Sequence, residues 1–319
     1  MTSIDTPATT GDTPIGFIGL GQMGAGMAAM LVSSGVRLMV FDVNPAAVSA
    51  MVAKGAIAAP GIAEISQQCE IVFMCVPGES EVEGVVFGSS GLLANTGCLQ
   101  AIIDTSTVTA TSARAFAGRV ENEYGKIYCD CPVSGLPKRA ADGSLTLMFG
   151  GSKQLFDSLL PVLSIMGKQV LHCGDIGSGQ MMKAVNNIMY NINIAGFCEV
   201  LPLAVKAGLD PLMVESLLTG GSSSSFASEH FVPRILDRKF DGDFPMKAAY
   251  KDILNIQDIA SEVEAHLPLV SAMVETYDEA IAAGYGGESK SAMIKVSEQR
   301  LGVTVRRSDT QDSTDLLAD

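Results

Sequence analysis

A glycine-rich segment near the start of the chain limits the available folds most strongly. The run Gly19-Leu20-Gly21-Gln22-Met23-Gly24 has the pattern G-x-G-x-x-G. It closes the apolar stretch Ile15–Leu20 and opens a helix predicted over Met23–Ser34. An acidic residue, Asp42, ends the next apolar stretch, 21 residues after Gly21. A strand, a glycine turn, a helix and an acidic residue in this order are typical of a dinucleotide-binding site.

Each glycine of this segment has a physical role in such a site. Gly19 permits the tight turn, Gly21 lets the backbone approach a pyrophosphate, and Gly24 lets helix and strand pack closely. The helix N-terminus adds free N–H groups and a partial positive charge. The alternative is that these are glycines of an ordinary turn. We predict a cofactor-binding segment made of Gly19, Leu20, Gly21, Gln22, Met23 and Gly24.

Asp42 determines which cofactor is expected. Its carboxylate can accept hydrogen bonds from both ribose hydroxyls of NAD, and it would repel the 2′-phosphate of NADP. The residues after it, Val43 and Asn44, supply no arginine for such a phosphate. We therefore predict NAD rather than NADP. Asp42 can also be interpreted as the cap of a helix that starts near Pro45, and the two roles are compatible.

Short apolar runs alternate with helical segments through the first half of the chain. The predicted strands are Ile15–Leu20, Val36–Phe41, Ala56–Ala58, Ile71–Val76, Ala101–Asp104, Ile127–Cys131, Leu145–Gly150 and Gln169–Cys173. The predicted helices are Met23–Ser34, Pro45–Lys54, Ile62–Gln68, Glu79–Phe87, Thr109–Glu123 and Lys153–Ile165. Apolar strands alternating with helices indicate a mostly parallel sheet covered on both faces. The prediction is an α/β fold with an N-terminal Rossmann-type, doubly wound parallel sheet.

The pattern changes after His172. The turn-rich segment Gly174–Gly179 is a predicted hinge, and Gln180–Ala207 has the length of a long helix, interrupted only by Pro202. Further helices are predicted over Pro211–Leu218, Phe226–Asp237, Met246–Glu264 and Leu269–Ala283. We therefore expect an all-helical second domain for substrate binding and oligomerisation. The predicted boundaries are a disordered leader at 1–13, the NAD-binding domain at 14–174, the helical domain at 175–303 and a disordered tail at 304–319.

Composition excludes some functions. A chain of 319 residues with 47% hydrophobic side chains is long enough for two domains with substantial cores. Its 21 basic and 35 acidic side chains give a net charge of −14, which argues against a nucleic-acid or anionic-membrane partner. No apolar run reaches the roughly 18–20 residues that a bilayer span needs. The N-terminus lacks the basic start and apolar core of a signal peptide, so we expect a cytoplasmic protein.

Seven scattered cysteines give no sign of a metal site. An odd number in a cytosolic chain predicts free thiols. Cys129-x-Cys131 and His172-Cys173 do not have the usual spacing of a zinc site. We predict buried core thiols and no metal.

Lys183 and Asn187 are candidate catalytic residues. They lie four residues apart near the start of the predicted long helix, so they share a face. A lysine beside a nicotinamide cofactor can protonate a carbonyl oxygen as hydride arrives, or assist proton removal in reverse. Partial burial and nearby cations would lower the pKa of that lysine toward neutrality. The run Gly177-Ser178-Gly179 would let another backbone come close. On spacing alone, however, Lys183 is more simply a solvated surface lysine.

Four motifs resemble one known family, in the family's order. Gly16–Gly24 resembles the opening signature of the β-hydroxyacid dehydrogenases, which include 3-hydroxyisobutyrate dehydrogenase, tartronate semialdehyde reductase and the shorter relatives of 6-phosphogluconate dehydrogenase. Asp130-Cys131-Pro132-Val133-Ser134-Gly135 resembles its substrate-binding motif, and Gly177–Asn187 resembles its catalytic motif. Lys251-Asp252-Ile253 resembles its late cofactor and substrate contact. The resemblance covers roughly Ile15 to Leu301.

The resemblance implies an NAD-dependent 3-hydroxyacid dehydrogenase acting on a small anionic β-hydroxy acid or semialdehyde acid. It also implies a homodimer or homotetramer. Lys183 would be the general acid/base and Asn187 its assistant. The implied binding residues are Ser134 and Gly135 for the substrate carboxylate, Lys251 for cofactor or substrate, and Val76, Pro77 and Thr107 for the cofactor. For Thr107, a helix cap is an equally good interpretation.

The run Leu136-Pro137-Lys138-Arg139 departs from the family pattern. The family usually continues Ser-Gly with another glycine and small residues. Leu136 replaces that glycine, and Lys138 and Arg139 add two cations. One interpretation is a solvated turn. The other is that a cation binds a second acidic group of the substrate, such as a carboxylate or sulfonate, because Arg suits planar oxyanions. Arg139 is therefore a candidate substrate-binding residue.

Other functions fit less well. An oxidative decarboxylating dehydrogenase of sugar phosphates usually pairs its lysine with a His-Asn dipeptide, whereas this chain has Asn186-Asn187. A non-catalytic NAD-sensing relative would be expected to lose Lys183, and imine reductases usually place another residue there. The retained lysine favours the hydroxyacid dehydrogenase.

Overall fold

The computed structural model describes residues 13–242 and 245–307. At positions 251, 252, 254, 255, 257, 258 and 262 it describes the backbone alone. The chain divides into two compact units, Met1–Lys183 and Ala184–Asp319, each described by itself below. Residues 1–12 of the predicted leader, and the predicted tail from residue 308 on, lie outside the described residues. The predicted domain boundaries stay predictions.

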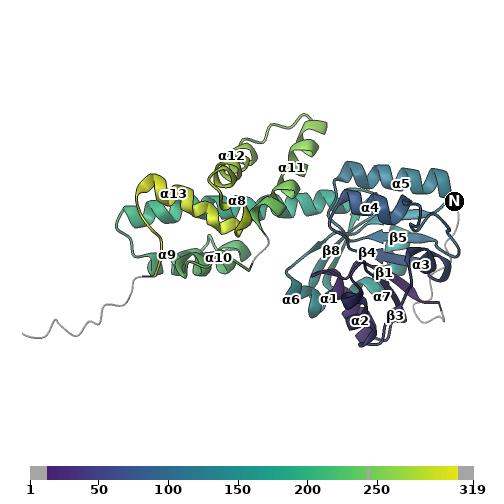
Figure 1. Ribbon diagram of the computed structural model, residues 1–319. Coiled ribbons are helices and arrows are strands. Elements are labelled where there is room, and N and C mark those ends of the chain that lie inside the picture. Colours follow the sequence, from purple (N-terminus) through teal and green to yellow (C-terminus); the bar gives the residue numbers. More distant parts are fainter. Residues whose placement is uncertain (1–12, 243–244, 308–319) are drawn as a thin grey trace, which may run out of the picture. The chain divides into compact units, whose positions relative to one another are not determined.

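The first unit is built on one nine-stranded sheet (Figure 1). Its order is β3-β2-β1-β4-β5-β6-β8-β7, and β9 also pairs with β8. Strands β1 to β6 are parallel, whereas β8 is antiparallel to β6 and β7. The order of β3 to β6 is that of a Rossmann fold, which confirms the predicted fold class. The strands are β1 (Ile15–Ile18), β2 (Leu38–Phe41), β3 (Ile57–Ala58), β4 (Ile71–Met74), β5 (Ala101–Asp104), β6 (Ile127–Asp130), β7 (Val133–Ser134), β8 (Leu145–Gly150) and β9 (Gly167–Gly174).

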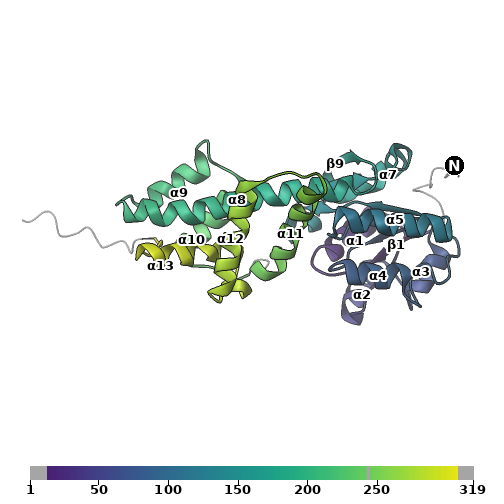
Figure 2. The same ribbon diagram turned by 90° about the horizontal axis from the view of Figure 1, so that it is seen from above.

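Helices cover both faces of this sheet. On one face lie α1 (Gly24–Ser33), α2 (Pro45–Val52), α6 (Pro137–Ala141) and α7 (Lys153–Met166). On the other face lie α3 (Ile62–Gln68), α4 (Glu79–Phe87) and α5 (Ala110–Tyr124). Helices α4 and α5 run side by side (Figure 2), joined by an ion pair between Arg119 and Glu83. The central strands are therefore buried on both faces, which explains their continuous apolar sequences.

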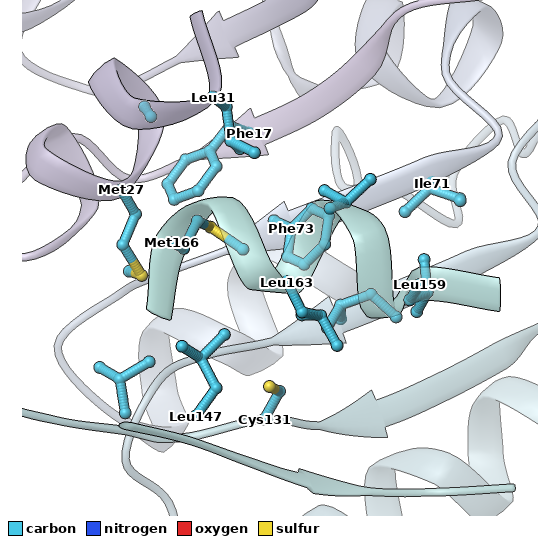
Figure 3. Packing of buried hydrophobic residues seen from close by; sticks show 14 of the residues in the cluster. Phe17, Met27, Leu31, Ile71, Phe73, Cys131, Leu147, Leu159, Leu163 and Met166 are labelled. Carbon is cyan, nitrogen blue, oxygen red and sulfur yellow. The ribbon is translucent and has the colours of Figure 1, made fainter. Parts of the chain in front are cut away.

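Two hydrophobic cores result, one on each face. Figure 3 shows side chains of α1 and α7 gathered against the strands, with Met27, Leu163 and Met166 in one cluster with Phe17 and Phe73. The ring centroids of Phe17 and Phe73 lie 6.4 Å apart. Their chain neighbours point to the opposite core because successive side chains of a strand alternate between faces.

The second unit is helical, as predicted. Its chain begins within α8 and continues through the following elements: α8 (Ser178–Lys206), α9 (Pro211–Gly220), α10 (Phe226–Leu236), α11 (Met246–Glu262), α12 (Pro268–Ala282), the short 3₁₀ helices η1 (Tyr285–Gly287) and η2 (Lys290–Met293), and α13 (Ile294–Leu301). Within this unit the hydroxyl of buried Tyr277 donates to Oδ1 of buried Asn191 at 2.6 Å.

The prediction that no apolar segment is long enough to span a bilayer is wrong for α8. Its 29 residues meet the length and mean hydropathy that a membrane span requires. A buried core helix passes the same test, and 44% of the most apolar window is buried inside the protein. The helix also carries the buried polar side chains of Gln180 and Asn191. We therefore interpret α8 as a core helix.

Five elements were not predicted: strand β7, helices α6 and α13, and the short 3₁₀ helices η1 and η2. Lys138 and Arg139, for which a solvated turn was one interpretation, are part of α6. Residues 304–307, which the prediction assigned to the tail, pack within the second unit. Val305 is buried and donates its N–H to Glu298 at 2.7 Å, and Arg307 forms ion pairs with Glu215 and Asp237.

The core of the first unit makes a stability prediction. Leu163 is fully buried, whereas Leu136 is 36% exposed. Leu163→Ala should lower the free energy of unfolding by about 3 kcal/mol, because it removes buried surface and leaves a cavity. Leu136→Ala, the matched control, should lower it by less than about 1 kcal/mol. Urea unfolding followed by circular dichroism measures both, and equal losses would contradict the packing.

Candidate active site

The glycine-rich segment lies between β1 and α1, as predicted. Gly19 has φ of 91°, and a Cβ there would lie 2.2 Å from the carbonyl oxygen of Cys75. A Cβ on Gly24 would lie 2.0 Å from the carbonyl oxygen of Gly19. The turn and the start of α1 therefore leave no room for side chains at these two positions.

The outer side of the same turn is open. In the described part of the chain, no atom lies within 4 Å of the place that a Cβ on Gly21 would take. Gly21 and Gln22 are exposed, Met23 is half-buried and Leu20 is buried. Helix α1 begins directly after this turn, and a helix N-terminus carries a partial positive charge. An open backbone beside a helix N-terminus fits the pyrophosphate of a dinucleotide.

Asp42 follows β2 and holds the glycine turn. Its Oδ2 accepts the N–H of Leu20 at 2.6 Å, and its Oδ1 accepts the N–H of Asn44 at 2.7 Å. Each carboxylate oxygen has further lone pairs, so Asp42 can still accept ribose hydroxyls. The cap of α2 is Asn44, whose side chain accepts the N–H of Ala46. The interpretation of Asp42 as that cap is therefore wrong.

Two more predicted cofactor segments follow the next strands. Val76 and Pro77 come after β4, and Thr107 comes after β5. Because carboxyl ends of parallel strands share one edge of a sheet, these segments lie at the same edge as the glycine turn. The N–H of Val76 donates to Oγ of Ser106 at 2.9 Å, which joins the two segments. The cap of α5 is Thr109, so the cap interpretation of Thr107 is wrong and its cofactor role stays a prediction.

A buried carboxylate joins β6 to α8. Oδ1 of Asp130 accepts the N–H of Gly177 at 2.7 Å, and Oδ2 accepts the N–H of Gln180 at 2.8 Å. A Cβ on Gly179 would lie 2.2 Å from the carbonyl oxygen of Met148, which confirms the predicted close approach of another backbone. Burial raises the pKa of Asp130 to about 6, although the two backbone N–H groups act to lower it.

Asp130 was not among the predicted site residues, although it lies in the predicted substrate-binding motif. One feature of the sequence could have indicated a role for Asp130. Asp130 is an acidic residue at the end of an apolar strand that the neighbouring elements cover on both faces. A buried carboxylate needs hydrogen-bond donors, so such a position predicts a structural or catalytic contact.

Lys183 lies in the second turn of α8 and is half-buried. Its Nζ donates to the carbonyl oxygen of Val133 at 2.7 Å. Val133 and Ser134 form β7, and Gly135 follows with φ of 144°. The structure thus brings the predicted catalytic lysine to the predicted substrate segment. The interpretation of Lys183 as a solvated surface lysine is wrong.

The geometry does not test the predicted roles of Asn187 and Lys251. Asn187 lies one turn further along α8, half-buried, and its carbonyl oxygen accepts Nδ2 of Asn191 at 2.7 Å. Lys251 belongs to α11, but its side chain lies outside the described residues. Their roles stay predictions.

Arg139 lies beside the substrate segment. It is an exposed residue of α6, and a Cβ on Gly135 would lie 3.2 Å from its Cβ and 3.4 Å from its Cδ. The aliphatic part of Arg139 therefore covers the backbone of Gly135. A guanidinium carried there is suited to bind an acidic group of a molecule held by the same segment.

All seven cysteines are free, as predicted. Cys69, Cys129, Cys131 and Cys198 are buried core thiols, whereas Cys75, Cys98 and Cys173 are only half-buried, which corrects the prediction. Burial raises the pKa of Cys75 to about 11 and that of Cys131 well above its ordinary range. His172 lies with Nε2 2.7 Å from the carbonyl oxygen of Gly151. Among residues 13–242 and 245–307, no group of three or more His, Cys, Asp or Glu side chains is arranged to hold a metal.

Comparison with known proteins agrees with this geometry. Residues 14–174 match the family described as the NAD binding domain of 6-phosphogluconate dehydrogenase. Residues 177–297 match the family described as NAD-binding of NADP-dependent 3-hydroxyisobutyrate dehydrogenase. The two families together account for most of the chain.

Individual relatives match over nearly their full length. The 2-(hydroxymethyl)glutarate dehydrogenase of Eubacterium barkeri is 38% identical over 91% of this chain and 97% of its own. The 2-hydroxy-3-oxopropionate reductase of Escherichia coli (strain K12) is 32% identical over 89% of this chain and 97% of its own. A solved structure of Mycobacterium tuberculosis 3-hydroxyisobutyrate dehydrogenase with L-serine has a TM-score of 0.78 and 30% identity, covering 89% of this chain and 98% of that one.

The buried carboxyl group predicts a pH dependence of stability. The pKa of Asp130 is about 6 in the folded protein, above its ordinary value of 3.8. The folded state thus binds this proton more tightly than the unfolded state, so the contribution of Asp130 to stability falls as pH rises toward about 6. Relative to Asp130→Asn, the unfolding free energy of the wild type should fall by up to about 1.4 kcal/mol per pH unit.

Urea unfolding between about pH 5 and about pH 7.5 measures this difference. The difference in unfolding free energy should level off at the upper end of this pH range. The exposed Asp175 gives the control Asp175→Asn, which makes the same substitution at the surface. A difference in unfolding free energy that stays constant, or that grows as pH rises, would contradict a raised pKa of Asp130 in the folded protein.

Proposed function

Because this chain belongs to the β-hydroxyacid dehydrogenase family, we propose that it is an NAD-dependent dehydrogenase of a small β-hydroxy acid or the matching semialdehyde acid. One observation carries the proposal. Nζ of Lys183 is bonded to Val133, directly beside Ser134 and Gly135, in the same unit as the glycine turn.

The proposed chemistry divides between cofactor and protein. The nicotinamide, when bound, accepts or supplies the hydride. Ser134 and Gly135 bind the substrate carboxylate through a hydroxyl and a backbone donor. Lys183 removes the proton from the substrate hydroxyl during oxidation and returns it to the carbonyl oxygen during reduction. Asn187 assists Lys183. A lysine can do this proton transfer without a metal.

The proposed cofactor is NAD. Asp42 has lone pairs available for ribose hydroxyls, and its negative charge would repel a 2′-phosphate. One of the matched families is described by NADP dependence, so the preference rests on Asp42 and on the absence of an arginine in Asp42-Val43-Asn44. The glycine turn 19–24, Val76, Pro77, Thr107 and Lys251 complete the proposed cofactor contacts.

The proposed substrate carries a second acidic group. Arg139 lies over Gly135 and can meet a carboxylate or sulfonate at the far end of a bound hydroxy acid. The relative from Eubacterium barkeri is named for a glutarate, which is a dicarboxylic acid. The relative from Escherichia coli is named for an oxopropionate, a mono-acid. We propose that Arg139 favours substrates with a second acidic group over mono-acids in this chain.

The proposed assembly is supported by exposed apolar side chains. The second unit exposes several large ones on α8 and α9, including Leu203, Met213 and Leu217, which are 56%, 70% and 65% exposed. Protein–protein contacts bury apolar side chains of this kind. We propose a cytoplasmic homodimer or homotetramer. The net charge of −14 disfavours nucleic-acid and anionic-membrane partners.

Lys183→Ala should abolish turnover without abolishing cofactor binding. Loss of a general acid/base costs about 100-fold to 10,000-fold in kcat. The NAD dissociation constant, measured by calorimetry, should change by less than about threefold, because the glycine turn is untouched. Lys206→Ala, at the exposed end of the same helix, is the matched control and should keep full activity. Substantial activity in Lys183→Ala would remove the lysine from the mechanism.

Arg139→Ala should change substrate selectivity. We expect kcat/KM to fall about 10-fold to 100-fold on hydroxy-dicarboxylates or hydroxy-sulfonates, because a charge-assisted pair is lost. The value on mono-acids such as 3-hydroxyisobutyrate should change little. Lys138→Ala, which removes the adjacent exposed cation of α6, should leave the ratio unchanged. Equal losses on both substrate classes, or no loss on either, would contradict a role for Arg139 in recognition.

A further inference from the structure

Gln180 is a buried amide whose two ends are both engaged. It lies in the first turn of α8 and is 2% exposed. Its Nε2 donates to the carbonyl oxygen of Ser106 at 2.8 Å, and its Oε1 accepts the N–H of Val108 at 3.3 Å. These two backbone groups flank Thr107. A carboxamide supplies one donor and one acceptor side by side, which this pair of groups requires.

Ser106 extends this contact to a second segment. Its N–H donates to Oδ1 of Asp104 at 2.8 Å, and its Oγ accepts the N–H of Val76 at 2.9 Å. The segments after β4 and after β5 are therefore tied to each other and to Gln180. Both are segments to which the proposed function assigns cofactor contacts.

The same part of α8 carries Lys183, three residues after Gln180. Residues three apart on a helix are neighbours on its surface, so a fixed Gln180 fixes the start of the Lys183 side chain. The lysine in turn reaches Val133 of the substrate segment. We propose that Gln180 is a positioning residue: its carboxamide sets Lys183 in register with the cofactor segments at 76–77 and 106–108. This inference rests on the proposed function and adds to it a residue that touches neither substrate nor cofactor.

Gln180→Glu tests the carboxamide with almost no change of shape. A protonated carboxyl group can donate to Ser106 and accept from Val108, as the amide does. An ionised carboxylate is acceptor-only and would face the carbonyl oxygen of Ser106. Burial and the nearby carboxylates of Asp130 and Asp104 favour the protonated form, whereas the guanidinium of Arg114, which lies against Gly177, favours the ionised form.

The variant should therefore be rescued by acid. We expect its NAD dissociation constant, measured by calorimetry without substrate, to match the wild type at the lowest pH tested and to exceed it by about tenfold at alkaline pH. Taking the ratio to wild type at each pH removes the titration of Asp130 itself. Gln154→Glu, on the exposed surface of α7, is the matched control and should give a ratio near one throughout.

Turnover separates positioning from simple packing. At saturating NAD and substrate, kcat of Gln180→Glu should also fall about tenfold at alkaline pH and recover in acid, because Lys183 is displaced with the helix. A ratio that does not change with pH, or a loss confined to NAD binding with kcat unchanged, would overturn the proposal. Absence of NAD binding in the wild type would instead overturn the proposed function. A Gln180→Leu variant is not needed, because Gln180→Glu at low pH is the folded reference for the same variant at alkaline pH.

Discussion

The rest of the site depends on the junction that Asp130 makes between β6 and α8. A single carboxylate at the end of a buried strand accepts two N–H groups from the start of the longest helix. Those N–H groups have no partner within the helix, so the contact stabilises both the helix end and the buried charge. The absence of a side chain at Gly179 lets the helix come close enough for these bonds.

Once α8 is held at this point, its rotation is set by two further contacts. Gln180 bonds to the backbone that follows β5, and Lys183 bonds to the backbone of β7. One turn of helix thus connects the strand edge that carries the glycine turn with the segment proposed to hold the substrate. This arrangement explains how Lys183, which is distant from the glycine turn in sequence, can act on a molecule that lies beside a cofactor bound at that turn.

Much of the fold followed from local sequence patterns. The helices Ile62–Gln68 and Glu79–Phe87 and the strands Ala101–Asp104 and Leu145–Gly150 have the predicted bounds, because turns or breakers flank them. The two strands are also almost fully buried, so they form continuous apolar runs. Strand β7 has two residues, and pairing with β8 holds it. Helix α6 has five residues and packs on α1 through Ala140. Such elements depend on tertiary contacts, which local patterns do not contain.

Part of the site was also predictable, because some of its residues form local sequence patterns. The glycine turn and Asp42 form a local pattern, and the lysine motif was recognised by resemblance. The roles of Asp130 and Gln180 were missed because their partners are distant in sequence: Gln180 lies 74 residues from Ser106 and 50 from Asp130. The cap roles of Asn44 and Thr109, each two residues beyond the residue suspected, depend on where the helix starts, which sequence patterns define only to within a few residues.

The most direct test of the account is the appearance of reduced cofactor when the purified protein is incubated with NAD, or separately with NADP, and a panel of β-hydroxy acids. The panel contains 3-hydroxyisobutyrate, glycerate, 4-hydroxybutyrate, a hydroxy-dicarboxylate and a hydroxy-sulfonate. The account predicts turnover with NAD in preference to NADP, fastest on a substrate with two acidic groups. Tight NAD binding without turnover of any substrate in either direction would contradict it and would favour an NAD-sensing protein.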